Sequence, residues 1–356
     1  MRRPLPLVLS ALTALVAALA GASVATASGH AAITITKNSD FQSCACVTSG
    51  SGSASSPYVI GPWAISAPSG GSTGWAVKVD NSNGGVTAFF TVTGISANYN
   101  DTVPTDPIIW LVGVHQATTV SSISANGDGT GLELDASSNI TVDNMNFNKM
   151  TGHAAFFNGA SNINMSNSKW KATQDGVAPH QADGLYALNS SYLNIGGVPA
   201  CPKSTACNTF DYDTGWGIYL QNSTHVNIEH ASANADDTGG YIFDNSSFVD
   251  LGNSTGEASG AICITLNGQK VFTGYRSDMQ GGLFLINGSS NNTIHDDAFA
   301  ADTGVSIGNG GNGFFINPCT NQNEPFTAEA RAGSGNSFVN DCYASNTFGL
   351  PPNPCK

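Results

Sequence analysis

A short phrase recurs along this 356-residue chain: an apolar stretch, then Asn or Asp, then small polar residues, then a second apolar stretch. The Asn or Asp markers stand at residues 135, 158, 189, 222, 245, 267 and 287, at intervals of 23, 31, 33, 23, 22 and 20 residues. Apolar residues alternate within the stretches, which is typical of a β-strand with one buried face. A unit this short cannot bury its own apolar face, so successive units must stack on one another.

The repeat predicts an all-β solenoid in a single domain, a right-handed parallel β-helix. We expect coils over residues 74–316, an N-terminal cap region over 28–73, and an irregular, disulfide-bonded C-terminal cap or tail over 317–356. The recurrent Asn is interpreted as a turn residue that accepts unusual backbone angles and hydrogen-bonds to the next coil. Alternation predicts two inward stacks: Leu185, Ile218, Tyr241 and Leu283, and beside them Ala187, Leu220, Phe243 and Leu285.

Two further stretches carry a resemblance to known proteins. The phrase Gly50–Ile60, followed by Trp63 and Ile65, is similar to one that opens many β-helix proteins, and Gly74–Val79 is expected to form an early strand. With the repeat, they resemble the pectate-lyase-like right-handed parallel β-helix superfamily, and more narrowly the NosD-type β-helix repeat proteins. The resemblance covers about residues 33–316 and implies the fold. It leaves the function open, because the superfamily hosts lyases, hydrolases, epimerases, adhesins and repeat proteins.

The N-terminus predicts export. Arg2 and Arg3 precede an apolar run that extends to Ala20, and Ala25-Thr26-Ala27 supplies a small-residue cleavage site. This is the pattern of a secretory signal peptide over residues 1–27, with an N-terminal membrane anchor as the alternative. We therefore expect a secreted, extracellular mature chain without a membrane span.

The charge balance bears on the partner. Charged residues make up 10% of the chain, and the formal net charge of −13 becomes −15 when Arg2 and Arg3 leave with the signal peptide. Nucleic-acid binding requires clustered Lys and Arg, so we expect no nucleic-acid partner.

The eight cysteines suit an exported protein, in which disulfides persist. Cys201 and Cys207 bracket a short loop and are the expected pair, whereas Cys44 and Cys46 are expected to pair elsewhere than with each other. Cys263 lies in an apolar stretch and is interpreted as a core thiol. Three more are expected to staple the C-terminal tail: Cys319, Cys342 and Cys355. No C-x-x-C motif occurs, which argues against a zinc site.

Two consecutive units are long, at 31 and 33 residues, and we expect their insertions to emerge side by side on one flank. Loops on a rigid scaffold often carry functional residues. The candidate catalytic residues on this flank are Asp183, Asp213, Asp236, Asp237 and His180. The candidate substrate-binding residues are Tyr186, Tyr219, Trp216, Lys171 and Tyr212. Of these, the first two are expected to stack as an exposed aromatic ridge.

An aromatic ridge beside carboxylates suits a sugar polymer, because rings pack against sugar C–H faces and carboxylates accept hydroxyl hydrogen bonds. Hydrolysis needs two carboxyl groups across the scissile bond, which Asp213 with Asp236 or Asp237 would supply. Lyase chemistry needs a base, for which His180, Lys171 and Tyr212 are candidates. In so acidic a chain, an acidic polymer would also need a Ca²⁺ bridge through the Asp cluster.

The sequence therefore favours a secreted carbohydrate-active protein that cleaves or binds an extracellular polysaccharide or cell-surface glycan, with Ca²⁺ as the one candidate cofactor. A hydrolase or lyase is favoured because the long insertions are adjacent, which a purely structural solenoid does not require. The alternative is a non-catalytic surface or carbohydrate-binding repeat protein, whose carboxylates would be spread and solvated.

Overall fold

The structure is a computed structural model. It describes residues 28–66, 74–99, 106–127, 129–172, 182–196, 208–211, 213–236, 239–252, 254–258, 263–266, 269–272, 281–295, 298–301, 305–309, 313–317, 322–326, 336–339, 342–343 and 347–348. The signal peptide expected over residues 1–27 lies outside these ranges, so export stays a prediction.

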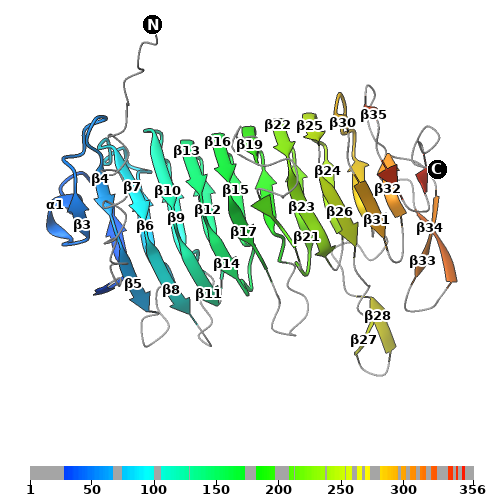
Figure 1. Cartoon of the computed structure of the whole chain (residues 1–356), viewed down its shortest axis with the longest axis horizontal. Coiled ribbons are helices and arrows are strands. Elements are labelled where there is room, and N and C mark those ends of the chain that lie inside the picture. Colours follow the sequence, from blue (N-terminus) through cyan, green and yellow to red (C-terminus); the bar gives the residue numbers. More distant parts are fainter. Residues whose placement is uncertain are drawn as a thin grey trace, which may run out of the picture.

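Three long sheets of 11 strands each run along the molecule, and the chain passes from sheet A to sheet B to sheet C in every coil (Figure 1). Sheet A contains β1 (Ser28–His30), β5 (Trp63–Ser66), β8 (Ile95–Tyr99), β11 (Ser124–Gly127), β14 (Asn146–Asn148), β17 (Ser168–Trp170), β20 (Asn208–Thr209), β23 (Ala231–Asp236), β26 (Thr255–Ala258), β31 (Ala298–Ala301) and β36 (Cys342–Tyr343).

Sheet B contains β2 (Ile33–Ile35), β6 (Val77–Asp80), β9 (Ile109–Val112), β12 (Leu132–Asp135), β15 (Ala155–Asn158), β18 (Leu185–Leu188), β21 (Trp216–Gln221), β24 (Gly239–Asp244), β29 (Gly281–Ile286), β32 (Val305–Asn309) and β37 (Thr347–Phe348).

Sheet C contains β3 (Val47–Ser49), β4 (Tyr58–Ile60), β7 (Phe90–Thr93), β10 (Thr118–Ser121), β13 (Ser138–Asp143), β16 (Ser161–Ser166), β19 (Ser191–Ile195), β22 (Thr224–Glu229), β25 (Ser247–Gly252), β30 (Thr293–His295) and β35 (Ser337–Val339). The neighbours in all three sheets pair in parallel, apart from the antiparallel pair β3–β4.

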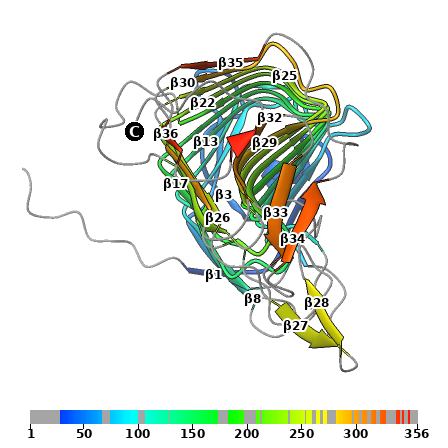
Figure 2. The same cartoon turned by 90° about the vertical axis from the view of Figure 1, so that its right-hand side faces the viewer.

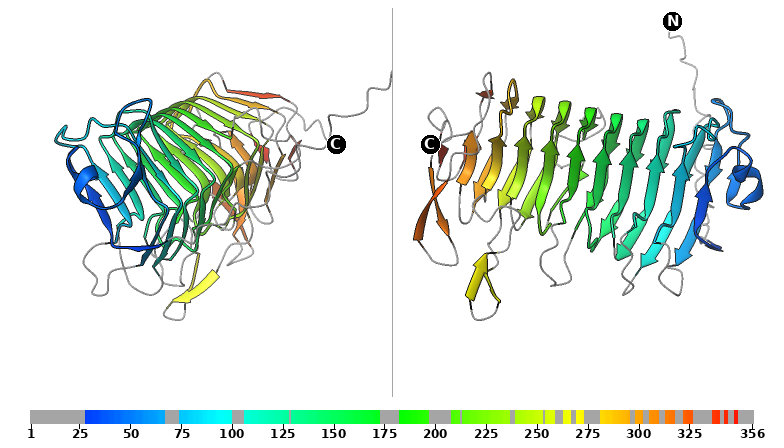
Figure 3. Two further views of the ribbon diagram at one scale, coloured as in Figure 1. Left: turned by 60° about the vertical axis from the view of Figure 1, so that its left-hand side comes forward. Right: turned by 180° about the vertical axis from the view of Figure 1, so that it is seen from behind.

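Viewed end-on, the three sheets enclose a continuous apolar core (Figure 2), and the view from behind shows the same regular stack (Figure 3). Connections between parallel strands of one sheet are right-handed in nearly all proteins. The chain is thus a right-handed parallel β-helix, as the repeat predicted.

The N-terminal end is covered by the short helix α1 (Asp40–Ser43). Phe41 of this helix is buried and stacks on Tyr58, with ring centroids 4.9 Å apart, and it also contacts the ring of Phe90. The coils begin earlier than the expected boundary at residue 74, because β1 and β2 already pair with β5 and β6. They also continue into the expected tail, where β35, β36 and β37 extend the three sheets.

One marker of the repeat does not belong to a coil. Asn267 lies between β27 (Cys263–Leu266) and β28 (Gln269–Phe272), which form an antiparallel hairpin inserted between β26 and β29. Figure 1 shows this hairpin projecting from the stack. A second antiparallel hairpin pairs β33 (Gly313–Asn317) with β34 (Gln322–Phe326). Cys263 therefore lies in a hairpin strand and not in a coil strand, and its interpretation as a core thiol stays a prediction.

The predicted core register is confirmed. Leu185 pairs with Ile218, which pairs with Tyr241, which pairs with Leu283, and all four are buried. The neighbouring stack pairs and is buried in the same way: Ala187, Leu220, Phe243 and Leu285.

The corner between sheets B and C explains the recurrent Asn. Asn189, Asn222, Asn245 and Asn287 all have φ of 50–51°, the left-handed conformation that Asn tolerates better than most residues. The amide of Asn245 donates to Oδ1 of Asn222 at 2.8 Å. The interpretation of Asn as a turn residue bonded to the next coil is therefore confirmed at this pair.

A column of buried serines follows these Asn residues: Ser190, Ser223, Ser246 and Ser289. The hydroxyl of Ser223 accepts the backbone N–H of Ser190 at 3.2 Å and donates to the carbonyl of Ala187 at 3.1 Å. Ser246 and Ser289 repeat this exchange one and two coils further on. Where the strand hydrogen bonds end, the serine hydroxyls therefore provide hydrogen-bond partners for the buried backbone N–H and C=O groups of this corner.

The expectation for Cys44 and Cys46 is wrong, because they form a disulfide with each other, with Cα atoms 5.0 Å apart. The backbone between them bends: Ala45 has φ of 54°, which brings the two side chains together. The expected pair Cys201–Cys207 lies outside the described residues, as do Cys319 and Cys355.

Candidate functional site

The two long insertions join different sheets. The first, residues 173–181, connects β17 of sheet A to β18 of sheet B, and the second, residues 197–207, connects β19 of sheet C to β20 of sheet A. Both lie between a sheet C strand and the next sheet B strand, as the sequence predicted, but on opposite sides of the intervening sheet A strand. They join the chain at the two opposite borders of sheet A, so sheet A is the face that both insertions adjoin.

Asp183 and Asp213 are buried, with 4% and 1% of their surface exposed. Oδ1 of Asp183 accepts the backbone N–H of Trp216 at 2.7 Å, and Oδ2 lies 3.2 Å from Nδ1 of His153. Oδ1 of Asp213 accepts the backbone N–H of Ala172. Both carboxyl groups therefore join neighbouring coils at the corner between sheets A and B, and neither lines an open groove as the sequence predicted.

Burial also changes the acidity of Asp213. Desolvation raises its pKa well above the usual range, the N–H of Ala172 opposes that rise, and the charges of Asp183 and Asp211 add to it. A Cβ atom at Gly184 would lie closer than 2.5 Å to Oδ2 of Asp213, so the carboxyl group points at the glycine that directly precedes β18 on the neighbouring coil. Gly184 is thus required by the close approach of this side chain.

The two tyrosines of the predicted aromatic ridge pair in the predicted register, but they are less exposed than predicted. Tyr186 and Tyr219 pair and stack with ring centroids 4.8 Å apart. Tyr186 is half-buried, but Tyr219 is 3% exposed and Trp216 is fully buried. They pack in an apolar cluster on the outer face of sheet B with Ile242, Phe284 and Ile286. The outward residues of the following coils are apolar, so the ridge ends in this cluster.

The remaining candidates are not brought together in the described structure. His180, Tyr212 and Asp237 lie outside the described residues, and so does the side chain of Asp236, which ends β23. Lys171 directly follows β17 and is half-buried on the outer face of sheet A.

That face carries an open groove of about 600 Å³. Two columns of outward side chains cross the strands of sheet A along it. The first column is Ser96, Ser124, Asn146, Lys169 and Thr209. The second is Asn98, Asn126, Asn148, Lys171 and Asp211. Hydroxyl and amide groups thus repeat at the spacing of adjacent strands, about 4.7–4.9 Å.

The charged side chains of the groove lie at its end nearest the two insertions. Lys169 and Lys171 follow the uncharged residues, and Asp211 comes one coil later, where its Oδ1 accepts the hydroxyl of Ser232 at 2.6 Å. Among the described residues that line the groove, Asp211 is the only carboxylate and the two lysines are the only cations. Sequence reasoning found Lys171 and missed the groove, although its signal was present in the alternating polar residues of three successive coils, Ser-x-Asn in two and Asn-x-Asn in the third.

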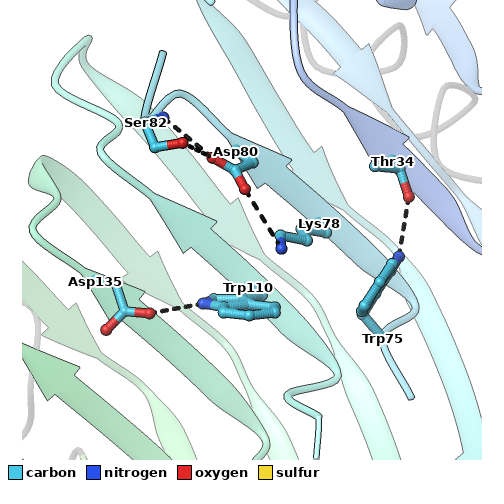
Figure 4. A network of polar contacts seen from close by, with 7 residues as sticks. All are labelled: Thr34, Trp75, Lys78, Asp80, Ser82, Trp110 and Asp135. Atoms are coloured by element: carbon cyan, nitrogen blue, oxygen red, sulfur yellow. Dashed lines mark hydrogen bonds and ion pairs between the residues drawn. The ribbon is translucent and has the colours of Figure 1, made fainter. Parts of the chain in front are cut away.

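A second polar network lies on the outer face of sheet B (Figure 4). Nε1 of Trp110 donates to Oδ2 of Asp135 at 2.8 Å, and Nζ of Lys78 lies 3.7 Å from the Trp110 ring centroid and 3.4 Å from Oδ2 of Asp80. Glu133 lies on β12, two residues before Asp135, and pairs with Trp110 of the preceding coil. Desolvation raises the pKa of Glu133 to about 8, with help from a hydrogen bond to Asp135 and the charge of Asp135.

Within the described ranges, no group of three or more His, Cys, Asp or Glu side chains gathers in a way that would hold a metal ion. The Ca²⁺ bridge that the sequence named as a candidate would have used the Asp cluster. Asp183 and Asp213 of that cluster are instead occupied by backbone N–H groups. Among the same described residues, no helix is long and apolar enough to cross a membrane.

The described strands form a right-handed parallel β-helix, the fold that the resemblance to the pectate-lyase-like superfamily implies. No family model and no curated protein matches the sequence, so the narrower likeness to NosD-type repeats stays a prediction.

Similar solved structures include the A-module of a mannuronan C-5 epimerase from Azotobacter vinelandii, with 11% identity over 82% of this chain and 81% of that one and a TM-score of 0.48. The catalytic domain of an α-1,3-glucanase in complex with nigerose has 13% identity over 92% of this chain and 62% of its own, with a TM-score of 0.40. A surface adhesin of Streptococcus pneumoniae has 11% identity over 82% and 72%, with a TM-score of 0.36. At these values the likeness concerns the coil architecture alone.

Proposed function

We propose that the protein binds an extracellular polysaccharide along the groove of sheet A. The observation that carries the proposal is the pair of side-chain columns in an open groove of about 600 Å³. Three successive coils each present a pair of hydroxyl or amide side chains at a constant spacing, so a polymer with repeated hydroxyl groups meets the same kind of partner on successive coils. The exposed groove side chains Ser124, Asn126 and Asn146 supply both donors and acceptors.

The composition of the groove supports a sugar polymer over other polymers. The uncharged residues outnumber Lys169, Lys171 and Asp211, whereas a nucleic-acid groove depends on clustered cations. Lys169 and Lys171 add charge-assisted donors for a hydroxyl or an acidic substituent of the polymer. Export through the N-terminal signal peptide forms part of the same proposal, since it places the protein beside extracellular glycans.

Cleavage of the bound polymer is the second candidate function. The observation that favours it is the adjacency of Lys171 and Asp211 in the groove, since a base and a carboxyl group at one point permit proton transfer. Hydrolysis by the usual mechanism needs two carboxyl groups, and the described lining supplies one. Base-assisted elimination therefore suits the described groove better than hydrolysis.

The test is a binding titration against soluble neutral polysaccharides and acidic ones, alginate and polygalacturonate among them, with and without Ca²⁺. Lys169→Ala removes a charge-assisted hydrogen bond worth about 1.5–3 kcal/mol, so the Kd of the bound polymer should rise tenfold or more. Asn126→Ala removes a neutral hydrogen bond, and the Kd should rise several-fold. Lys37, exposed near helix α1, provides the matched control Lys37→Ala, whose Kd should equal that of the unaltered protein.

Equal Kd values for all three variants would contradict binding in this groove. The same incubations, read for new reducing ends and for the absorbance of unsaturated uronates, separate binding from cleavage. Reducing ends without absorbance indicate hydrolysis, both together indicate elimination, and neither indicates a binding protein.

A further inference from the structure

Three aromatic side chains project from the B–C corner of successive coils. Tyr192, His225 and Phe248 are each the second residue of β19, β22 and β25. Their rings stack, with centroids 4.9 Å apart for the first pair and 5.1 Å for the second. Tyr192 is 57% exposed and Phe248 is 52% exposed, and they are the only large hydrophobic side chains of the described residues that are exposed. We call these three residues the corner ridge.

The backbone of the corner ridge is poorly suited to aromatic residues. Tyr192, His225 and Phe248 have φ of 55°, 55° and 56°, a left-handed conformation that bulky residues rarely adopt. Other coils have Asn at the same position: Asn139, Asn162 and Asn291, with φ of 61°, 54° and 56°. The turn itself therefore needs Asn, and the aromatic residues increase both the strain and the exposed apolar surface. Residues that break local rules in this way cluster at functional sites.

A column of amides runs beside the corner ridge on sheet C. The side chain of Asn227 donates to Asn194 at 2.9 Å, and that of Asn194 donates to Asn164 at 3.2 Å. Asn164, Asn194 and Asn227 pair across β16, β19 and β22, and the last two lie two positions beyond Tyr192 and His225. Ring edges, a Tyr hydroxyl and uncharged amides thus form one strip that advances about 4.7–4.9 Å per coil.

This strip fits a glycan better than a protein. A stable protein interface buries at least about 1,200 Å² in total, more than six side chains on a narrow corner provide. A sugar chain presents C–H groups and hydroxyl groups side by side, which match ring edges and amides. The column Asn164, Asn194 and Asn227 carries no charge, and the carboxylate that follows it on β25, Asp250, lies 3.3 Å from Nε2 of His295, so the matching polymer is a neutral one.

We propose that the corner ridge and the Asn164–Asn194–Asn227 column form a second glycan-binding strip, which takes a neutral polysaccharide. The B–C corner does not border sheet A, so the strip is separate from the groove. The observations that support the strip involve no residue of the groove. If both sites bind, one molecule holds two polysaccharide chains.

The test replaces Tyr192, His225 and Phe248 together with Asn, the residue that other coils use at this position. Asn relieves the left-handed strain, so the triple variant should fold with a Tm equal to or above that of the unaltered protein. The probes are insoluble cellulose and insoluble chitin, which are neutral. The unaltered protein should be retained on at least one of them, and the association constant of the triple variant should be lower by about tenfold or more.

Lys37→Ala serves as the control, because Lys37 is exposed and lies outside both the groove and the strip, and it should be retained like the unaltered protein. The triple variant leaves the groove residues intact, so its Kd for the soluble polysaccharide of the groove titration should be unchanged, and failure of the groove and failure of the strip give different results. Equal retention of the triple variant and the unaltered protein, or no retention of either on both solids, would overturn the proposal. Sedimentation that showed a dimer for the unaltered protein and a monomer for the triple variant would also overturn it, by assigning the ridge to self-association.

Discussion

Single residues at the corners determine how the coils stack. At the B–C corner, Asn245 supplies the left-handed turn and Ser246 closes the hydrogen bonds that the strands leave open. At the A–B corner, carboxylate oxygens of Asp183 and Asp213 accept backbone N–H groups of neighbouring coils. Gly184 has no side chain, which leaves space for the carboxyl group of Asp213. Buried polar groups with such partners fix the register of neighbouring coils, because an unmade hydrogen bond in the interior is costly.

Ser223→Ala tests this account of the corner. The change leaves the N–H of Ser190 and the carbonyl of Ala187 without their side-chain partner, so the free energy of unfolding should fall by about 1–3 kcal/mol. Denaturant unfolding measures the loss. Ser247→Ala is the matched control, since its half-buried hydroxyl lies 3.5 Å from Oγ1 of Thr224 and its removal should cost little. A Ser223→Ala protein as stable as the control would show that the serine column contributes nothing.

The outer face of each strand differs from coil to coil, although the inner face repeats. On sheet B the residues that face outward in one column pass from Lys78 and Trp110 through Glu133 to the aromatic and apolar residues of later coils. The early strands β6, β9 and β12 therefore carry a charged network, and the later strands β21, β24 and β29 carry an apolar cluster. Glu133 lies between Trp110 and Phe156 in this column. Its carboxyl group therefore loses hydration, which favours the neutral form.

The pH dependence of Glu133 follows from its raised pKa. Between pH 4.5, its ordinary pKa, and about 8, its pKa in the fold, the folded protein keeps a proton that the unfolded chain has lost. Stability from this group is therefore highest below this window and falls as pH rises through it. Glu133→Gln removes the titration, so its Tm relative to the unaltered protein should be higher at pH 9 than at pH 5. The groups that face Glu133 are Asp135, Asp106 and Lys78. An unchanged Tm difference at the two pH values would contradict the assigned pKa.

The inner face was predictable from the sequence and the outer face was not. Alternation places Leu185 and Ile218 inside, because every inward position meets the same apolar core. The exposure of Tyr219 depends on Ile242 and Phe284, which follow 23 and 65 residues later in the chain, so no local pattern shows it. Asn267 matches the repeat locally, but the strands around it pair with each other as a hairpin. Pairing partners are a tertiary property, and a 22-residue period does not specify them.

Across the whole molecule, the order of the sheets decides which segments meet. The insertions at 173–181 and 197–207 leave from opposite borders of sheet A, so the face between those borders is the one that both adjoin. The formal net charge of the chain is −13, yet two of the six lysines in the described ranges, Lys169 and Lys171, face this groove. The two lysines give this groove local positive charge in an acidic chain, which supports the proposal that it is the ligand-binding face.

Lysine footprinting tests the central claim most directly. The purified protein is acetylated with a limiting amine reagent, with and without the soluble polysaccharide that gives the lowest Kd in the titration, and the labelled peptides are measured by mass spectrometry. Polysaccharide in the groove should lower the labelling of Lys169 and Lys171 and leave that of Lys37, between β2 and α1 at the N-terminal end of the coil stack, unchanged. Undiminished labelling of Lys169 and Lys171 under saturating polysaccharide would contradict binding in the sheet A groove.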